Sequence, residues 1–308
     1  MISPRGLGLI AAMATGLAGY GLADETETAE AAPLAYVDCS GVAKQGGLLL
    51  CEGLPGSILD VSSPEGAHAR SVTIGENGRV AIGLKQHEGA FLTISVQDTS
   101  LAMTAPIEKR DDPYRVIEGF DCDKVDARTQ EQKDHAGRSW VKKQAAFKTF
   151  ETGPGATTGF ILPAKGPASS PFGPTRKYIG VGKDGEPCER TSVHRGYDLA
   201  VPVGTEIIAP AAGTVTLGEP DLYYEGGTVF LDHGDGLVSV FLHMSAVDVE
   251  AGETVQVGDR LGASGNTGRT TGPHLHWAVK WRNLSSDNRS GDFYIDPALL
   301  LELRQPSG

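Results

Sequence analysis

The sequence predicts a mainly β chain made of a small N-terminal β-sandwich, a helical linker and a C-terminal antiparallel β-sheet unit. Its 308 residues include 41 glycines and 18 prolines, a composition typical of many turns between short strands. Short apolar runs alternate with polar residues toward both ends of the chain, whereas one charged stretch between them lacks that alternation. A chain of this length accommodates two domains of ordinary size.

The first 31 residues have the layout of a secretory signal peptide. Arg5 precedes an uncharged apolar run over residues 7–23, and an acidic, alanine-rich segment follows. We expect an exported protein, cleaved after Ala23 or within residues 29–32, with no stable membrane span after cleavage. An uncleaved anchor is the alternative, because a run of about 17 residues is near the lower limit for crossing a bilayer.

Residues 32–108 are predicted to form the N-terminal β domain. Turn residues separate five short alternating runs: GGLLLCEGL, SILDVSS, ARSVTIG, GRVAIGL and AFLTISVQ. No residue in this segment indicates catalytic chemistry.

Residues 109–155 are predicted to be a linker that becomes a helix. Residues 126–151 lack strand alternation and contain good helix formers, apart from Gly137. The helix is expected to dock at its C-terminal end, where its apolar residues gather: Trp140, Val141, Phe147 and Phe150. A break at TGPG then leads into a second β-rich unit over residues 156–303, followed by a tail at 304–308.

The formal net charge of -12 argues against nucleic acid as a partner. A strongly acidic chain lacks the electrostatic basis for binding nucleic acid, so none is expected.

The four cysteines form no C-x-x-C pair, so disulfides are a better interpretation than a structural zinc site in an exported chain. Three pairings are possible. A hairpin would bring Cys39 and Cys51 within bridging range. That pairing leaves Cys122 and Cys188, whose bridge would pin the linker beside the segment that contains His194.

Two histidines lie two residues apart in TTGPHLHWAV, a run typical of a strand. Side chains at such positions share one face of a strand, so His274 and His276 are expected side by side. Protonation of one imidazole disfavours protonation of the other, which indicates a metal or a reacting group between them.

Further candidate residues precede this pair. The segment SVHRGYDLAVPVG contains His194 and Asp198, and its Gly196 and Pro202 favour a loop entering a strand over a helix. His243 ends the alternating run VSVFLHMS. Two imidazoles and one carboxylate could bind Zn²⁺ and leave a fourth position open, as in catalytic sites. The two remaining histidines could then move protons.

The motifs HRGYD, FLHMS and SGNTGRTTGPHLHW resemble those of the lysostaphin-type, or LytM-like, zinc metallopeptidases, metallopeptidase family twenty-three. The resemblance covers about residues 160–301 and implies a LytM-like peptidase domain with an antiparallel β-sheet. It also implies a zinc-dependent endopeptidase that hydrolyses peptide bonds of peptidoglycan stem peptides or cross-links, with a Zn-activated water attacking the scissile carbonyl. The implied zinc ligands are His194, Asp198 and His276. By position, His243 and His274 match the pair that activates the water and stabilises the tetrahedral intermediate.

The resemblance leaves two other functions open. One is a noncatalytic LytM-like regulator of a cell-wall amidase, and the other is a binding module whose main activity lies in the N-terminal sandwich. The domain order resembles periplasmic members of the family, so the expected location is the periplasm or cell envelope and the expected partner is peptidoglycan peptide. His233 is expected to be structural, Trp277 to pack in the core and Trp281 at the rim. Either Tyr223 or Tyr224 could line the site.

Overall fold

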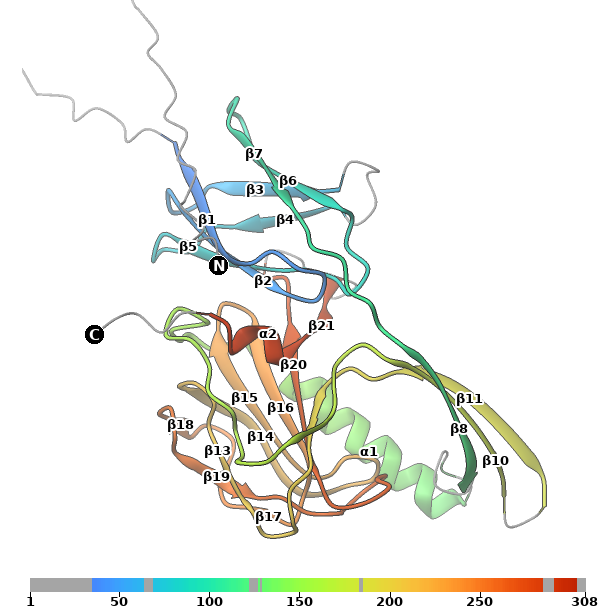
Figure 1. Cartoon of the computed structure of the whole chain (residues 1–308). Helices are drawn as coiled ribbons and strands as arrows, with labels where there is room; N and C mark the ends of the chain where they lie inside the picture. The colour runs from blue at the N-terminus through green and yellow to red at the C-terminus, as the bar shows by residue number, and fades with distance from the viewer. Residues whose placement is uncertain are drawn as a thin grey trace, which may run out of the picture.

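The computed structural model confirms the mainly β architecture (Figure 1). It describes residues 35–63, 69–121, 127, 129–182, 185–284 and 291–303. The predicted signal peptide and C-terminal tail lie outside these described residues. Within the described ranges, no helix is long and apolar enough to cross a membrane.

The N-terminal strands form two antiparallel sheets, with the orders β1-β2-β5 and β4-β3-β6-β7. Alternate residues of β6 are buried, as expected for a strand with one face in a core. Buried apolar side chains from both sheets belong to one cluster. The strands are β1 Val37–Val42, β2 Leu48–Gly53, β3 Ile58–Ser62, β4 Arg70–Thr73, β5 Arg79–Gly83, β6 Phe91–Val96 and β7 Ala102–Pro106.

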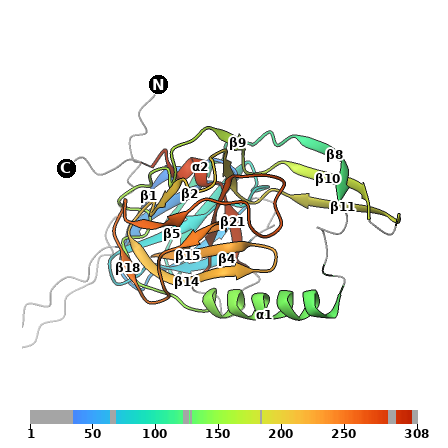
Figure 2. The ribbon, with the colours of Figure 1, turned by 90° about the horizontal axis from the view of Figure 1, so that it is seen from below.

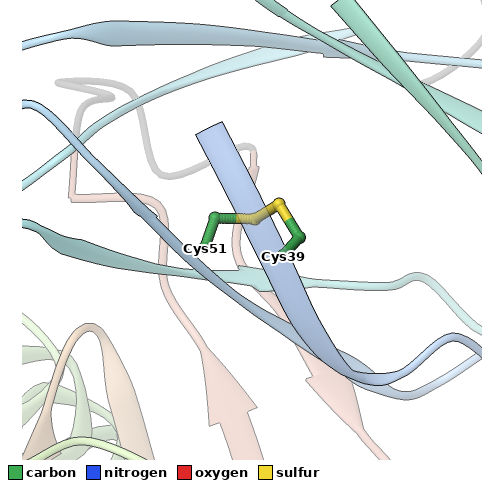
Figure 3. The surroundings of a disulfide bond; sticks show 2 residues. All are labelled: Cys39 and Cys51. Atoms are coloured by element: carbon green, nitrogen blue, oxygen red, sulfur yellow. A yellow bond between two sulfur atoms is a disulfide. The ribbon is translucent and has the colours of Figure 1, made fainter. Parts of the chain in front are cut away.

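A disulfide joins β1 to β2 (Figure 3). Cys39 and Cys51 lie directly opposite each other in the hairpin, with their Cα atoms 4.1 Å apart. The pairing predicted for this hairpin is confirmed. The other predicted bridge includes Cys122, which lies outside the described residues, while Cys188 is disulfide-bonded.

A three-stranded sheet, which we call the arm, projects from one side of the molecule (Figure 1). It consists of β8 Tyr114–Asp121, β10 Thr175–Val181 and β11 Pro187–Val193. The central strand β10 pairs antiparallel with β11 and parallel with β8. Because β8 comes from the segment expected to be a linker, that segment contributes a strand as well as a helix.

Helix α1 spans Gln130–Ala146, within the stretch predicted to be helical. Thr129 and Gln132 form a capping box at its start. The expected docking at the far end is made by Phe147, whose ring centroid lies 4.6 Å from that of Phe230. Trp140 and Val141 are exposed and take no part in it, because they occupy the solvent face of the helix. Figure 2 shows α1 beside β14, across from the arm.

The wide sheet has the order β18-β14-β15-β16-β20-β12-β9, with β21 paired to β20. Its strands are β9 Ala168–Ser170, β12 Tyr197–Leu199, β14 Gly213–Leu222, β15 Gly226–Gly234, β16 Leu237–Met244, β18 Thr254–Val255, β20 Leu275–Trp281 and β21 Phe293–Ile295. A smaller sheet joins β13 Glu206–Ile208, β17 Ala246–Val247 and β19 Arg260–Ala263, and the short helix α2 Pro297–Leu300 follows β21.

Trp281 joins the N-terminal sheets to the wide sheet. Its indole Nε1 donates a hydrogen bond to the carbonyl of Ala81 at 3.0 Å. A Cβ at Gly83 would lie 2.7 Å from Trp281 Cγ, so only glycine leaves room for the ring. The prediction that Trp281 packs at the rim is wrong, because the N-terminal unit covers it and leaves 1% of its surface exposed. Trp277 is buried, as predicted.

Candidate metal centre

Neighbouring strands bring the candidate residues together. Asp198 in β12 lies directly opposite His276 in β20, and His276 lies opposite Leu242 in β16. His243 follows Leu242 near the end of β16, while His194 follows the last residue of β11. The segment from His194 to Asp198 is a loop entering a strand, as predicted.

Three side chains direct their donor atoms at one point. Asp198 Oδ1 lies 3.1 Å from His194 Nε2 and 2.8 Å from His276 Nδ1. The two nitrogens are 3.3 Å apart. Two nitrogens and one carboxylate oxygen in such an arrangement are a donor set that suits Zn²⁺ with an open fourth position.

The backbone around His194 fixes the orientation of its ring. His194 Nδ1 lies 2.6 Å from the carbonyl oxygen of Pro171, which can only accept a hydrogen bond. Nδ1 therefore donates this bond, and Nε2 is the nitrogen turned toward Asp198. On the other side of the cluster, a Cβ at Gly196 would lie 2.4 Å from His276 Nε2. The glycine of HRGYD thus leaves space for the His276 ring.

His243 and His274 lie beside these three residues, with a ring-centroid separation of 4.9 Å. His243 Nδ1 donates to the carbonyl of Thr267 at 2.9 Å, and His274 Nδ1 donates to that of Gly272 at 2.8 Å. In each ring the second nitrogen is Nε2, and His274 Nε2 is 3.8 Å from Asp198 Oδ1.

His243 adopts a backbone conformation that non-glycine residues rarely take, with φ of 65°. Its backbone N–H donates to the carbonyl of Glu225 at 2.8 Å, which holds this residue in place at the end of β16. Such conformations cost about 1–3 kcal/mol and persist where surrounding contacts determine them.

Burial and neighbouring charges set the protonation of the cluster. Burial raises the pKa of Asp198, but its hydrogen bonds to His194 and His276 and the charges of those rings outweigh burial and hold the pKa well below its ordinary range. Burial, together with His276 and His274, lowers the pKa of His243 to about 3. Burial is also the largest cause of the lowered pKa of His276. Asp198 is therefore ionised, and His243 and His276 are neutral, near pH 7.

Sequence reasoning missed Arg176 of the arm. Its Nη2 lies 3.7 Å from Asp198 Oδ2, the carboxylate oxygen turned away from the histidine donors, and it also donates to Ser170. The carbonyls of Pro171, Thr267 and Gly272 were missed too. Every residue carries a carbonyl, so no sequence signal could have identified them.

The tyrosine pair lies at the turn between β14 and β15. The Arg269 guanidinium stacks over the Tyr224 ring at 4.7 Å, and the Tyr224 hydroxyl accepts a hydrogen bond from the backbone of Ala127. His233 lies elsewhere in the wide sheet, and both of its ring nitrogens bond to protein atoms, as expected of a structural residue.

Comparison with known sequences places this cluster in a family. Residues 192–288 match the sequence model of Peptidase family M23. A Haemophilus influenzae protein named as a metalloprotease is 39% identical over 149 residues, which are 46% of this chain and 29% of the relative. Peptidoglycan DD-endopeptidase ShyA of Vibrio cholerae is 41% identical over 93 residues, 30% of this chain and 21% of the relative. The chain therefore spans less than a third of the length of either relative.

A solved structure extends the likeness beyond the matched segment. A crystal structure of a candidate peptidase M23 from Pseudomonas aeruginosa is 27% identical, with a TM-score of 0.55. The likeness covers 85% of this chain and 96% of that chain. All five clustered residues fall within residues 192–288, and by these matches the chain carries a peptidase M23 domain of the LytM and lysostaphin family.

Proposed function

We propose that the protein is a zinc-dependent endopeptidase that hydrolyses peptide bonds of peptidoglycan stem peptides or cross-links. The observation that carries this proposal is the convergence of His194 Nε2, Asp198 Oδ1 and His276 Nδ1 beside two further histidines. Relatives named as peptidoglycan DD-endopeptidases support the substrate class.

His194, Asp198 and His276 would hold the metal. Bound there, Zn²⁺ supplies a Lewis acid that polarises a carbonyl and lowers the pKa of water. A single carboxylate among the ligands leaves the site with net positive charge. Arg176 pairs with the outer carboxylate oxygen at 3.7 Å and so helps to orient Asp198.

His243 and His274 would carry the proton transfer and charge stabilisation. Each ring has its Nδ1 proton committed to a carbonyl, so its Nε2 can accept a proton from water and later return it to the leaving amine. A ring that has accepted the proton can donate from Nε2 to the oxyanion of the tetrahedral intermediate. Because burial and the neighbouring His276 and His274 lower the pKa of His243 to about 3, this ring is neutral near pH 7.

The regulator of a cell-wall amidase is the less favoured function. A regulator has no need of a complete ligand set, whereas this chain holds all three candidate ligands and both additional histidines in one cluster. The same substrate class implies a location in the cell envelope, and we include exported, periplasmic placement in the proposal.

Digestion of purified muropeptide dimers tests this function. The zinc-loaded protein should convert cross-linked dimers to monomers, with masses that identify the cleaved bond. Chelation should abolish the products and zinc should restore them. A protein that binds one equivalent of zinc and yields no products from any dimer would favour the regulator.

A further inference from the structure

A cavity of about 370 Å³ lies between the N-terminal unit and the peptidase domain. The turn after β5 supplies Lys85 and His87 to its wall, and the peptidase side supplies Arg195, Lys280 and Tyr294. Figure 1 shows β20 and β21, which contain the last two residues, reaching the N-terminal sheets. Neither unit forms this cavity alone.

The cavity adjoins the candidate metal centre. Its lining residue Phe172 follows Pro171, whose carbonyl holds the ring of His194, and its lining residue Arg195 follows His194 itself. Lys280 and His276 lie on the same face of β20 because they are four residues apart. At the usual rise of a strand they are separated by about 13 Å.

The charge of the lining is opposite to that of the chain. Three cationic side chains, Lys85, Arg195 and Lys280, line the cavity with one carboxylate, Asp292, in a protein with a net charge of -12. Asp292 is already close to one of the cations, with Oδ2 3.5 Å from Lys280 Nζ. The lining therefore has excess positive charge and favours an anion.

Two of the lining groups sharpen that preference. Burial lowers the pKa of Lys85, and the charge of Arg70 lowers it further against the opposing effect of Glu88, so an anion in the cavity would stabilise its ammonium group. Burial raises the pKa of Tyr294 to about 12, so its hydroxyl keeps its proton at neutral pH. The cavity thus offers an ammonium, a guanidinium and a hydroxyl, which suit a carboxylate.

The turn that contains Lys85 is fixed relative to the metal centre. The Lys85 backbone N–H donates to Glu88 at 3.1 Å, and Gln86 Nε2 donates to the carbonyl of Gly173 at 2.8 Å. Gly173 in turn donates its N–H to the carbonyl of His194 at 2.9 Å. The Lys85 side chain takes no part in these bonds, so replacing it leaves them in place.

We propose that this cavity binds a carboxylate of the peptide substrate, with Lys85 and Arg195 as its recognition groups. The cavity residue Lys280 lies about 13 Å along β20 from the metal-centre residue His276. Because an extended peptide advances about 3.3–3.6 Å per residue, the bound carboxylate would lie about four residues from the cleaved bond. The N-terminal unit is then part of the substrate site and selects acidic peptides at that distance. This inference rests on the proposed endopeptidase function.

The test pairs substrates with a variant of Lys85. Synthetic cross-linked peptides would differ only in carrying a terminal carboxylate or carboxamide at this distance, and a second pair would differ in a side-chain carboxylate. For the zinc-loaded wild type, amidation of the recognised carboxylate should lower kcat/KM about 10- to 100-fold, the effect of losing one charged hydrogen bond. Comparing the two pairs identifies which carboxylate enters the cavity.

The variant distinguishes recognition from a structural role. Lys85→Gln should lower kcat/KM on the carboxylate peptide and shrink the effect of amidation, because only Arg195 then remains to recognise the carboxylate, while Lys85→Arg should retain most of the discrimination. Lys165→Gln removes an exposed lysine that does not line the cavity and should behave as wild type. Equal discrimination by wild type and Lys85→Gln would overturn the proposal and leave the endopeptidase function standing.

A binding measurement separates the two proposals if no peptide is cleaved. Calorimetry with zinc-loaded protein and a four-residue peptide should show about 10-fold weaker binding of the carboxamide than of the carboxylate, and a smaller difference for Lys85→Gln. Absence of cleavage together with this binding difference would overturn the hydrolytic function and support the cavity. Equal binding of both peptides by wild type would overturn the cavity.

Discussion

The wide sheet contains two buried groups of histidine and aspartate. We call Asp232 and His233 the structural group and compare it with the metal centre, because the two groups differ in which atoms their ring nitrogens bond to. In the structural group, His233 bonds through Nδ1 to the carbonyl of Ala212 and through Nε2 to the hydroxyl of Ser239, each at 2.8 Å. In the metal centre, His194 and His276 instead direct nitrogens at each other and at one oxygen of Asp198. Buried histidine alone therefore indicates little, whereas convergence of donor atoms on one point indicates a ligand.

Removal of the Asp198 carboxylate should have the largest effect. Asp198→Ala takes away the one anionic donor and leaves two imidazoles, so zinc content should fall from one equivalent to near zero and activity to that of the metal-free protein. Metal analysis after dialysis and dimer digestion measure both. Asp248→Ala, which removes an exposed carboxylate paired with Arg260, is the matched control and should retain metal and turnover. Full zinc and normal turnover in Asp198→Ala would show that the ligand set is wrong.

The two histidines outside the ligand set should separate chemistry from metal binding. His243→Ala and His274→Ala should each lower kcat about 10²- to 10⁴-fold, the usual contribution of a proton-transfer or oxyanion group, while zinc stays bound. Steady-state kinetics with metal analysis measures this. His135→Gln on α1 is the control, because its ring contacts Asp221 and Tyr223 and not the cluster. Loss of zinc in both alanine variants would mean that ligand and catalytic roles are shared.

Local sequence patterns predicted the features that are set by residues close together in the chain. Strand alternation predicted the mainly β fold, the i, i+2 spacing placed His274 and His276 on one face, and a hairpin predicted the Cys39–Cys51 bridge. The resemblance selected the five residues that the structure brings together. In each case the signal lies within a few residues of the feature or in a recurring motif.

Features that depend on distant contacts could not be predicted. β8 is a strand because it pairs in parallel with β10, some 60 residues later in the chain, and nothing in its charged neighbourhood signals that pairing. Trp281 is buried because Gly83, about 200 residues earlier, leaves space for its ring. Arg176 and Lys85 look like ordinary charged strand and turn residues. Only the packing of separate segments places the first beside Asp198 and the second in a cavity.

Asp232 belongs to the structural group with the adjacent His233. A substitution that disturbs this group should lower the free energy of unfolding and leave the chemistry of the metal centre unchanged. Arg282 Nη2 lies 2.5 Å from Asp232 Oδ2, and both side chains are 1% exposed. Arg282→Ala would leave this carboxylate buried without its cationic partner, so the free energy of unfolding should fall by about 3–5 kcal/mol. Urea unfolding at pH 7 measures the loss, with zinc content as a check on the metal centre.

Arg260→Ala is the matched control, because it breaks an exposed ion pair with Asp248 that should contribute at most about 1 kcal/mol. Similar losses in the two arginine variants would contradict the contrast between a buried and an exposed pair. Loss of zinc from folded Arg282→Ala would show that the two buried groups are coupled.

The smallest expected effect is a pH dependence of stability that originates at His233. Burial lowers the pKa of this residue to about 4, against an ordinary value near 6.5. The unfolded chain therefore binds the proton more readily, and the contribution of His233 to stability is fully present above about pH 6.5 and is lost as the pH falls toward 4. The shift corresponds to at most about 3 kcal/mol.

Unfolding of metal-free protein between pH 4.5 and 7.5 should show a smaller loss of stability for His233→Gln than for wild type, because the other titrating groups are common to both. Parallel curves would place the acid sensitivity elsewhere, whereas a flatter curve for the variant would show that His233 serves the fold by staying neutral.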